Sequence, residues 1–332
     1  MKYNFPKVDL HLHLDGALIP EVAYELAKER KLPCAEWSFE KLREEMVVGE
    51  GLDDLYAYLK RFEVPIAIMQ DEEALERSAY ELMKNLAGQG LIYSEIRFAP
   101  QQHCRKGCTQ RQASEAVARG VKKAEKDFNI HGGVILCAMT YQDVNDNQVE
   151  NMETVKVAGE LLGQGVIGID IAGAEGIVPM AEHAPVFVEA RKQDIPFTIH
   201  AGEVDIPEDV KIAIEFGAKR IGHGQSCINN DEVFKMVLDK KIPLELCLTS
   251  NIQSRVRESY EAHPLKRLYD AGAIVTMNTD NMILSNVTLE QEYDMAAKTF
   301  GFTEADFIQM NKNSLQAAFM EESLRTELLK LF

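Results

Sequence analysis

Short hydrophobic runs alternate with longer amphipathic stretches along almost the whole chain. Eight runs of strand length lie at residues 8–16, 91–99, 133–140, 166–173, 196–201, 220–224, 243–249 and 274–279. Between the runs, hydrophobic residues recur at the three- and four-residue spacing of one helix face. Residues 72–86 and 113–128 show this spacing, with hydrophobic side chains at Leu75, Ala79, Leu82, Leu86, Val117, Val121, Ala124 and Phe128. The pattern predicts eight strands separated by helices.

Regular alternation of strand and helix predicts parallel strands joined by right-handed crossovers. Eight repeats of that unit predict a closed (β/α)8 barrel, the TIM-barrel architecture, for which a typical chain has about 250 residues plus insertions. The runs are continuously hydrophobic, as expected of strands that are covered on both faces. No linker rich in Pro, Gly or Ser divides the 332 residues, so we expect residues 1–332 to form one domain.

Two stretches exceed what the barrel requires. Residues 20–70 are longer than one crossover helix, and the second part of this stretch is rich in hydrophobic residues. Residues 52–70 either pack as helices on the barrel wall or form a hydrophobic lid over the barrel mouth, closing on a ligand. Residues 303–332 predict two terminal helices that cover the exterior of the barrel.

The charge balance narrows the range of partners. The chain holds 53 acidic and 36 basic residues, a net charge of −17, whereas nucleic acids and anionic membrane surfaces attract basic patches. We therefore expect a small-molecule partner, with no nucleic acid and no membrane, and leave the oligomeric state open. No hydrophobic run has the length of a signal peptide or a membrane span, which predicts a cytoplasmic protein.

The six cysteines are scattered, which is typical of reduced thiols in a large core. Cys104 and Cys108 follow His103 closely, but their spacing and polar surroundings favour surface thiols over a second metal site.

Several histidines and acids fall where predicted strands end, and in a barrel the C-terminal strand ends share one mouth. His11 and His13 lie two residues apart on the first strand, so they face the same side. His200 and His223 end the fifth and sixth strands, Glu203 follows His200 by three residues, and Asp280 follows the eighth strand. The other histidines, which we expect in loops or helices, are His103, His131, His183 and His263.

Each of these residues alone has an ordinary structural interpretation, but their coincidence at one mouth indicates a site. Three imidazoles and one carboxylate form a zinc-type ligand set, and zinc lowers the pKa of a bound water from about 15.7 toward about 7. His223, together with Asp280, could accept the proton and hold the resulting hydroxide in line, while Glu203 could protonate the leaving side of a substrate. The end of the fourth strand holds no lysine that could bridge a second metal, so we expect one zinc ion.

Five motifs give the chain a resemblance to the adenosine deaminase family over nearly its whole length. They are, in order, His11-Leu-His13-Leu-Asp15-Gly16, Asp170-Ile-Ala-Gly173, His200-Ala-Gly-Glu203, Ile221-Gly-His223-Gly224 and Asn278-Thr279-Asp280. The resemblance implies hydrolytic deamination of adenosine, and of 2′-deoxyadenosine, to inosine and ammonia. The other class of zinc deaminase uses His-x-Glu and Pro-Cys-x-x-Cys motifs, and neither occurs in this chain.

The resemblance also implies a role for each matching residue. His11, His13, His200 and Asp280 would bind zinc. Glu203 would protonate the purine N1, and His223 would serve as a base or as an electrostatic anchor for the attacking hydroxide. The Gly173 amide would bond the purine N3, and Asp15 would bind the ribose 5′-hydroxyl with His13 close by.

One position departs from the family pattern. Asn281 follows Asp280 where the family often has a second aspartate, which contacts the purine N7. An asparagine amide can donate to N7, so we expect purine recognition to persist. Another 6-aminopurine, adenine or a modified adenosine, remains an alternative substrate, although adenine deaminases tend to have Glu in place of Asp15. A barrel that only binds nucleosides would lack Glu203, His223 or Asp280, and all three are present.

Overall fold

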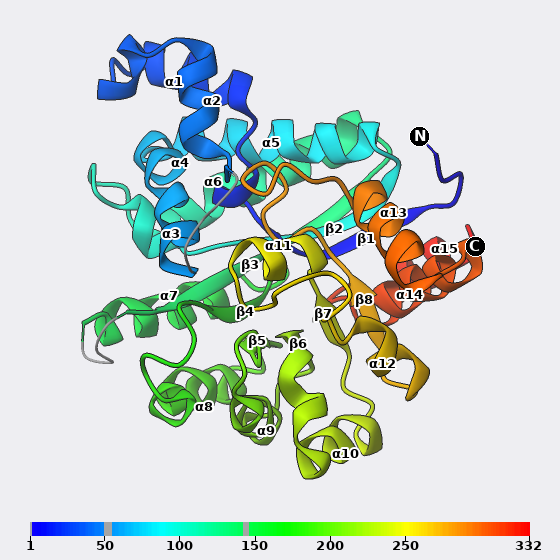
Figure 1. Ribbon diagram of the computed structural model, residues 1–332. Helices are drawn as coiled ribbons and strands as arrows, with labels where there is room; N and C mark the ends of the chain where they lie inside the picture. Colours follow the sequence, from blue (N-terminus) through cyan, green and yellow to red (C-terminus); the bar gives the residue numbers. More distant parts are fainter. Residues whose placement is uncertain (1, 50–54, 142–145) are drawn as a thin grey trace.

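Eight parallel strands form the centre of the molecule in the computed structural model, which describes residues 2–49, 55–141 and 146–332. The strands are β1 (Lys7–His13), β2 (Leu91–Phe98), β3 (His131–Thr140), β4 (Val166–Gly173), β5 (Thr198–Ala201), β6 (Arg220–His223), β7 (Leu244–Leu246) and β8 (Val275–Met277). They pair in sequence order as two four-stranded sheets, β1 to β4 and β5 to β8. Figure 1 shows these strands around a common centre, with the helices outside.

Two parallel bridges join the sheets into a closed barrel. Ile169 of β4 pairs with Phe197 just before β5, and Leu12 of β1 pairs with Asp280 just after β8. The amide of His13 donates to the Asp280 carbonyl at 2.7 Å, and the amide of Asp280 donates to the His11 carbonyl at 2.8 Å. The predicted (β/α)8 barrel is therefore confirmed.

Several strand boundaries differ from the prediction by one to three residues, and three of these differences change how nearby residues are assigned. β1 ends at His13, where a 3₁₀ turn, η1 (Asp15–Ala17), replaces the expected continuation to residue 16. β7 ends at Leu246 rather than at residue 249, because the helix α11 (Leu248–Gln253) begins there and the Glu292 carboxylate accepts from the Thr249 amide in its first turn. His131 is the first residue of β3 and not a loop or helix residue.

Helices connect and cover the strands. Besides α11, the α-helices among the described residues are α1 (Pro20–Glu29), α2 (Phe39–Met46), α3 (Leu55–Leu59), α4 (Glu63–Ile68), α5 (Glu72–Gly88), α6 (Gln110–Asp127), α7 (Gln148–Leu161), α8 (Ala184–Lys192), α9 (Pro207–Phe216), α10 (Asp231–Asp239), α12 (Leu265–Asp270), α13 (Leu289–Phe300), α14 (Glu304–Ala317) and α15 (Glu322–Leu329). Further 3₁₀ turns are η2 (Pro33–Glu36), η3 (Lys60–Phe62), η4 (Pro100–His103), η5 (Met180–His183) and η6 (Gln225–Asn229).

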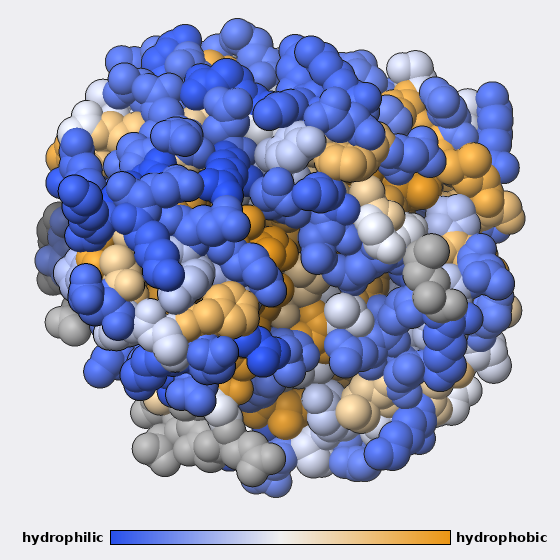
Figure 2. All heavy atoms as spheres, turned by 90° about the horizontal axis from the view of Figure 1, so that it is seen from above, coloured by the Kyte–Doolittle hydropathy of each residue, from blue (hydrophilic) through white to orange (hydrophobic). Residues whose placement is uncertain are grey.

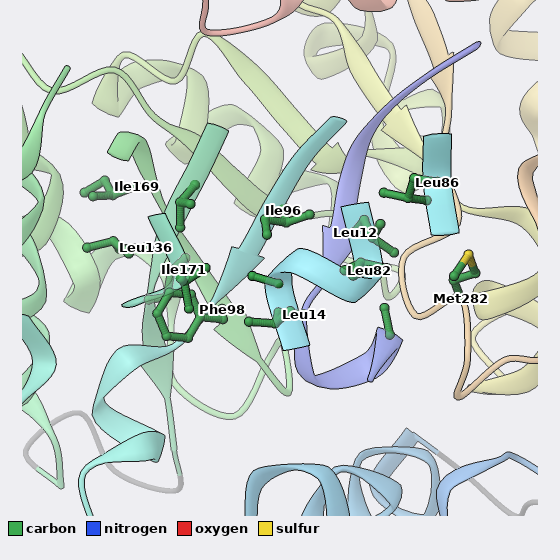
Figure 3. Packing of buried hydrophobic residues seen from close by; sticks show 14 of the residues in the cluster. Leu12, Leu14, Leu82, Leu86, Ile96, Phe98, Leu136, Ile169, Ile171 and Met282 are labelled. Carbon is green, nitrogen blue, oxygen red and sulfur yellow. The ribbon is translucent and has the colours of Figure 1, made fainter. Parts of the chain in front are cut away.

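The two helices expected from hydrophobic spacing are confirmed as α5 and α6. Each begins at a side-chain cap that accepts an otherwise unpaired amide: Asp71 for α5, and Thr109 in a capping box for α6. The predicted stripe of α5 is buried, and Figure 3 shows Leu82 and Leu86 in the same cluster as Leu12 of β1. Burial of this stripe holds the helix against the barrel.

The C-terminal part of the chain lies at the end of the barrel where the strands begin. The predicted terminal helices are confirmed as α14 and α15, and α14 packs against β1 and β8. Phe319 lies in the segment between these two helices, and its ring centre is 3.9 Å from the Arg220 guanidinium. Arg220 also donates to the carbonyl of Ala317, the last residue of α14. Because Arg220 is the first residue of β6, the tail covers the N-terminal end of the barrel as well as its exterior.

No helix among residues 2–49, 55–141 and 146–332 is long and hydrophobic enough to cross a membrane.

Leu82→Ala tests the packing of α5 on the barrel. Leu82 is fully buried, so the substitution removes buried surface and leaves a cavity. We expect the free energy of unfolding to fall by about 2–5 kcal/mol in urea titrations at fixed zinc concentration. Lys84→Ala on the exposed face of the same helix is the control, with an expected change below about 1 kcal/mol. Equal losses in the two variants would contradict this packing.

Candidate active site

A cavity of about 500 Å³ opens where the C-terminal ends of the strands meet. Residues from several strand ends line it, and Tyr58, Leu59, Phe62 and Ile66 of α3, η3 and α4 form part of its wall. The segment that we expected either on the barrel wall or as a lid therefore borders the mouth, while its residues 52–54 lie outside the described residues. Figure 2 shows hydrophobic side chains between hydrophilic ones near the middle of one face.

The four predicted metal ligands lie together at the base of this cavity. The Nε2 atoms of His13 and His200 are 3.2 Å apart, and Oδ1 of Asp280 lies 3.5 Å from Nε2 of both His11 and His13. His11 is fully buried, and its Nε2 has no hydrogen-bond partner among the described residues. Three imidazole nitrogens and a carboxylate oxygen that converge in a buried place form a ligand set that fits a divalent metal such as zinc.

Two buried carboxylates hold the ligand histidines from behind. Nδ1 of His200 lies 2.7 Å from Asp170 Oδ2, and Nδ1 of His11 lies 2.8 Å from Glu245 Oε2. An Nδ1–H that is engaged in this way leaves Nε2 free to face the metal. The Arg97 guanidinium bonds both carboxylates, at 2.7 and 2.9 Å. Burial alone would raise the pKa of Glu245, but Arg97 and Arg220 hold it well below its usual range.

Glu203 stands beside the ligand cluster as a buried acid. Burial, with the nearby charges of Asp280 and Glu175, raises its pKa well above the usual range, which favours the protonated carboxyl. The Glu175 carboxylate accepts from the amides of Gly202 and Val204, at 2.5 and 2.8 Å, on both sides of Glu203. These two hydrogen bonds hold the loop that presents the acid.

His223 faces the same space from the end of β6. Its Nε2 lies 3.9 Å from Glu203 Oε2, and burial lowers its pKa well below the usual range, so the ring is neutral. His223 has φ of +58° and Asp280 has φ of +59°, a left-handed conformation that is uncommon outside glycine. Strained backbone of this kind is typical of functional sites, where the surrounding structure holds the side chains in place.

The residues expected to bind the substrate also line the cavity. Asp15 is buried with Oδ1 unpartnered among the described residues, and burial raises its pKa to about 7. Gly173 has φ of +116°, and a Cβ there would lie 2.5 Å from the Thr140 carbonyl oxygen, so only glycine fits. Asn281 donates from Nδ2 to the Tyr58 hydroxyl at 3.0 Å. These three residues and His13, the four residues expected at the substrate, thus line the cavity together with Glu203.

Several residues of the site escaped sequence analysis. Asp170 begins one of the five motifs, but its position behind His200 was not predicted. Glu245 and Tyr58 have no local signal, because each reaches the site by contacts between distant parts of the chain. Cys247 was expected in the seventh strand, yet its sulfur belongs to a compact group with His11, His223 and Asp280. Burial, together with the nearby charges of Asp280 and Asp9, raises the pKa of this thiol well above its usual range, which favours the protonated form.

The remaining histidines and cysteines lie apart from the ligand cluster. His103 is fully buried in η4 and its Nδ1 donates to the Met69 carbonyl at 2.7 Å. Cys104 and Cys108 are half-buried rather than fully exposed, and Cys104 Sγ donates to the Pro100 carbonyl. All six cysteines are free, in agreement with the expectation of reduced thiols.

Comparison with known proteins identifies the family. The model of the adenosine deaminase family matches residues 6–332. The adenosine deaminase of Clostridium perfringens is 37% identical over 326 residues, covering 98% of this chain and 97% of its own length. The chain belongs to the adenosine deaminase family. Its enzymes are metal-dependent hydrolases of C–N bonds, so the resemblance expected from the five motifs is confirmed.

Two solved structures share the fold of this adenosine deaminase family member. The adenine deaminase of Arthrobacter aurescens superposes with a TM-score of 0.89 at 23% identity, covering 98% of both chains. An amidohydrolase of Burkholderia ambifaria with bound zinc superposes with a TM-score of 0.86 at 23% identity, covering 98% of this chain and 91% of its own. At this identity the two structures support the barrel architecture.

Asp170→Asn tests the support behind His200. Asp170 accepts from the His200 and Ile171 amides with one oxygen, while the other accepts from Arg97 and lies 2.7 Å from His200 Nδ1, so an amide NH2 must face donors on one side. We expect zinc affinity to fall about 10- to 100-fold in competition with a chromogenic chelator. Asp239→Asn on the surface is the control, and equal affinities of the two variants would contradict this role.

Proposed function

We propose that this chain catalyses the hydrolytic deamination of adenosine, and of 2′-deoxyadenosine, to inosine and ammonia in purine metabolism. The observation that carries the proposal is the meeting of His11, His13, His200 and Asp280 with a buried, protonated Glu203 in one cavity. Membership of the adenosine deaminase family, over 98% of the chain in the comparison with the Clostridium perfringens enzyme, supports the same substrate.

One zinc ion per chain is the proposed cofactor. His11, His13, His200 and Asp280 would hold it, because their donor atoms converge and carboxylates lie behind His11 and His200. When bound, zinc supplies a nucleophile at neutral pH by lowering the pKa of a water molecule from about 15.7 toward about 7.

Glu203 is the proposed general acid. As the water oxygen bonds to the purine C6, the electron pair of the C6–N1 double bond moves onto N1, and Glu203 delivers a proton to that nitrogen. The 6-amino group then takes the proton of the new C6 hydroxyl and leaves as ammonia as the C6–N bond breaks, so the oxygen remains on C6 as the carbonyl of inosine and N1 keeps its proton. The raised pKa of Glu203 keeps its proton available at neutral pH, and His223 would hold the attacking oxygen in line.

The substrate contacts follow from the residues that line the cavity. The Gly173 amide would donate to the purine N3, and Asn281 would donate from its amide to N7, which is an acceptor. Asp15 would bind the ribose 5′-hydroxyl beside His13, with its unpartnered Oδ1 as the acceptor. Hydrophobic residues of η3 and α4 at the mouth would exclude water from the bound purine.

We further infer a single domain over residues 1–332, a small-molecule purine nucleoside as the partner rather than nucleic acid or membrane, and a cytoplasmic location. The net charge of −17 supports the choice of partner, because it disfavours polyanionic surfaces.

The direct test is ultraviolet absorbance of the purified protein with adenosine, with adenine in parallel, before and after chelator treatment. We expect conversion of adenosine that the chelator abolishes and zinc restores. Conversion of adenine instead would show that the substrate is another 6-aminopurine and that Asp15 and Asn281 do not select the ribose of adenosine. No conversion of adenosine, 2′-deoxyadenosine or adenine by zinc-loaded protein would overturn the proposed reaction.

Glu203→Gln removes the proton donor and preserves the shape of the side chain. We expect kcat for adenosine to fall by at least about 100-fold, because general acid catalysis contributes roughly 10²- to 10⁴-fold. Zinc content and the affinity for inosine should stay within a few-fold of the parent values. Glu208→Gln, an exposed substitution on α9, should retain full activity as the control. A substantial residual rate in Glu203→Gln would exclude the assigned role.

A further inference from the structure

Behind His223 lies a buried hydrogen-bonded series of side chains that the proposed reaction does not use. Asn251 of α11 places Nδ2 at 3.2 Å from His223 Nδ1 and Oδ1 at 3.2 Å from His263 Nε2. The amide of Leu265 lies 3.1 Å from His263 Nδ1. The side chains of His223, Asn251 and His263 are almost completely buried, so each contact is made between protein groups.

The Leu265 amide decides which nitrogen of His263 carries a proton. A backbone N–H can only donate, so His263 Nδ1 must accept and cannot hold a hydrogen. Burial lowers the pKa of His263 to about 3, which keeps the ring neutral with one proton. That proton is therefore on Nε2, and His263 donates from Nε2 to Asn251.

The same argument determines the orientation of the Asn251 amide and then which nitrogen of His223 carries the proton. Because His263 Nε2 donates, the Asn251 atom that faces it must be the carbonyl oxygen Oδ1, and the amide cannot be turned by 180°. Nδ2 of Asn251 then donates to Nδ1 of His223, which must accept. A neutral His223 ring that accepts at Nδ1 carries its proton on Nε2, the nitrogen that faces Glu203 and the cavity.

We propose that Asn251 and His263 are positioning residues that hold His223 in the Nε2–H form, so that His223 donates a hydrogen bond to the oxygen that attacks the purine. This inference rests on the proposed function and separates the two roles left open for His223. A neutral imidazole with its hydrogen already on Nε2 cannot take a proton at that atom. It orients a lone pair of the attacking oxygen toward C6 and stabilises negative charge on that oxygen.

In a neutral imidazole, the hydrogen-bond partner of one ring nitrogen determines whether the other nitrogen carries the proton. Here the partner is an amide, which donates, rather than a carboxylate, which would accept. The Asn251 amide therefore places the proton of His223 on Nε2. The carboxylates behind His11 and His200 have the opposite effect, because they favour the proton on Nδ1 and leave Nε2 without one. The site thus contains two classes of histidine, acceptors toward the metal and one donor toward the attacking oxygen.

Nuclear magnetic resonance of the zinc-loaded protein tests the assignment without turnover. In protein with ¹⁵N-labelled histidine, long-range proton–nitrogen spectra distinguish a ring protonated on Nε2 from one protonated on Nδ1. Loss of one ring system in His223→Gln, and of another in His263→Gln, assigns the signals. We expect both His223 and His263 to be protonated on Nε2 alone. Protonation of His223 on Nδ1, or on both nitrogens, would overturn the proposal.

Asn251→Asp reverses the donor to His223 and preserves the shape of the side chain. The new carboxylate still accepts from His263 but must also accept from His223 Nδ1–H, which leaves His223 Nε2 without its hydrogen or charges the ring. We expect kcat for adenosine to fall by about 10²-fold or more, as for other wrong-tautomer variants, with KM within a few-fold and zinc content unchanged. Asn85→Asp, an exposed amide-to-acid change that still accepts from Gln89, is the matched control.

His263→Ala removes the group that orients Asn251, and we expect kcat to fall about 10-fold or more, with mixed protonation of His223 in the spectra. His131→Ala, at the far end of β3, should match the parent protein.

Full activity of Asn251→Asp with the His223 proton moved to Nδ1 would overturn the donor role. If the parent protein did not deaminate adenosine, the proposed function would fail, while the spectra would still decide the protonation of His223.

Discussion

The pairing of β1 with the segment that follows β8 is the interaction on which the site depends. The strands lie at opposite ends of the chain, yet the backbone bonds that close the barrel between them involve His11, His13 and Asp280, three of the four proposed ligands. The Asp9 carboxylate strengthens this seam by accepting from the amide and the hydroxyl of Thr279. The contacts that close the barrel therefore also bring these proposed ligands together. The fourth ligand, His200, comes from β5 in the second sheet.

Buried charge in the barrel interior links that seam to the rest of the molecule. Arg97 and Arg220 share the Glu245 carboxylate, while Arg97 also bonds Asp170 and Arg220 also bonds Glu95, and all five side chains are fully buried. Removing one member would leave an unpaired charge in a dry interior, which costs far more than the loss of a surface pair. Through these contacts the C-terminal tail, held by Arg220, is connected to the carboxylates behind His11 and His200.

The parts of the site that the sequence could predict are those set by local periodicity and strand order. Alternation along β1 places His11 and His13 on one face, and parallel strands bring His200, His223 and Asp280 to the same end of the barrel. The end of β7 was predicted wrongly, because a buried hydrophobic run does not reveal where a strand gives way to a helix. Cys247 consequently lies nearer to the site than expected.

The residues that support the catalytic side chains could not be predicted in this way. Tyr58 meets Asn281 across more than 220 residues, Glu175 holds the amides around Glu203, and Asn251 bonds both His223 and His263. Each of these is a polar residue whose type and spacing are ordinary, and its partner depends on how loops pack at the mouth. A single sequence contains no periodic signal for such contacts, whereas their hydrogen-bond geometry in the folded chain is specific.

The central claim is that closure of the barrel places His11, His13, His200 and Asp280 around one metal ion. Anomalous diffraction at the zinc edge from crystals of the zinc-loaded protein measures this directly. The account predicts one strong peak, about 2.0–2.2 Å from Nε2 of each histidine and from one oxygen of Asp280. A peak bonded to Cys247 or to His223 in place of these ligands, or a second peak of equal height in the cavity, would contradict it.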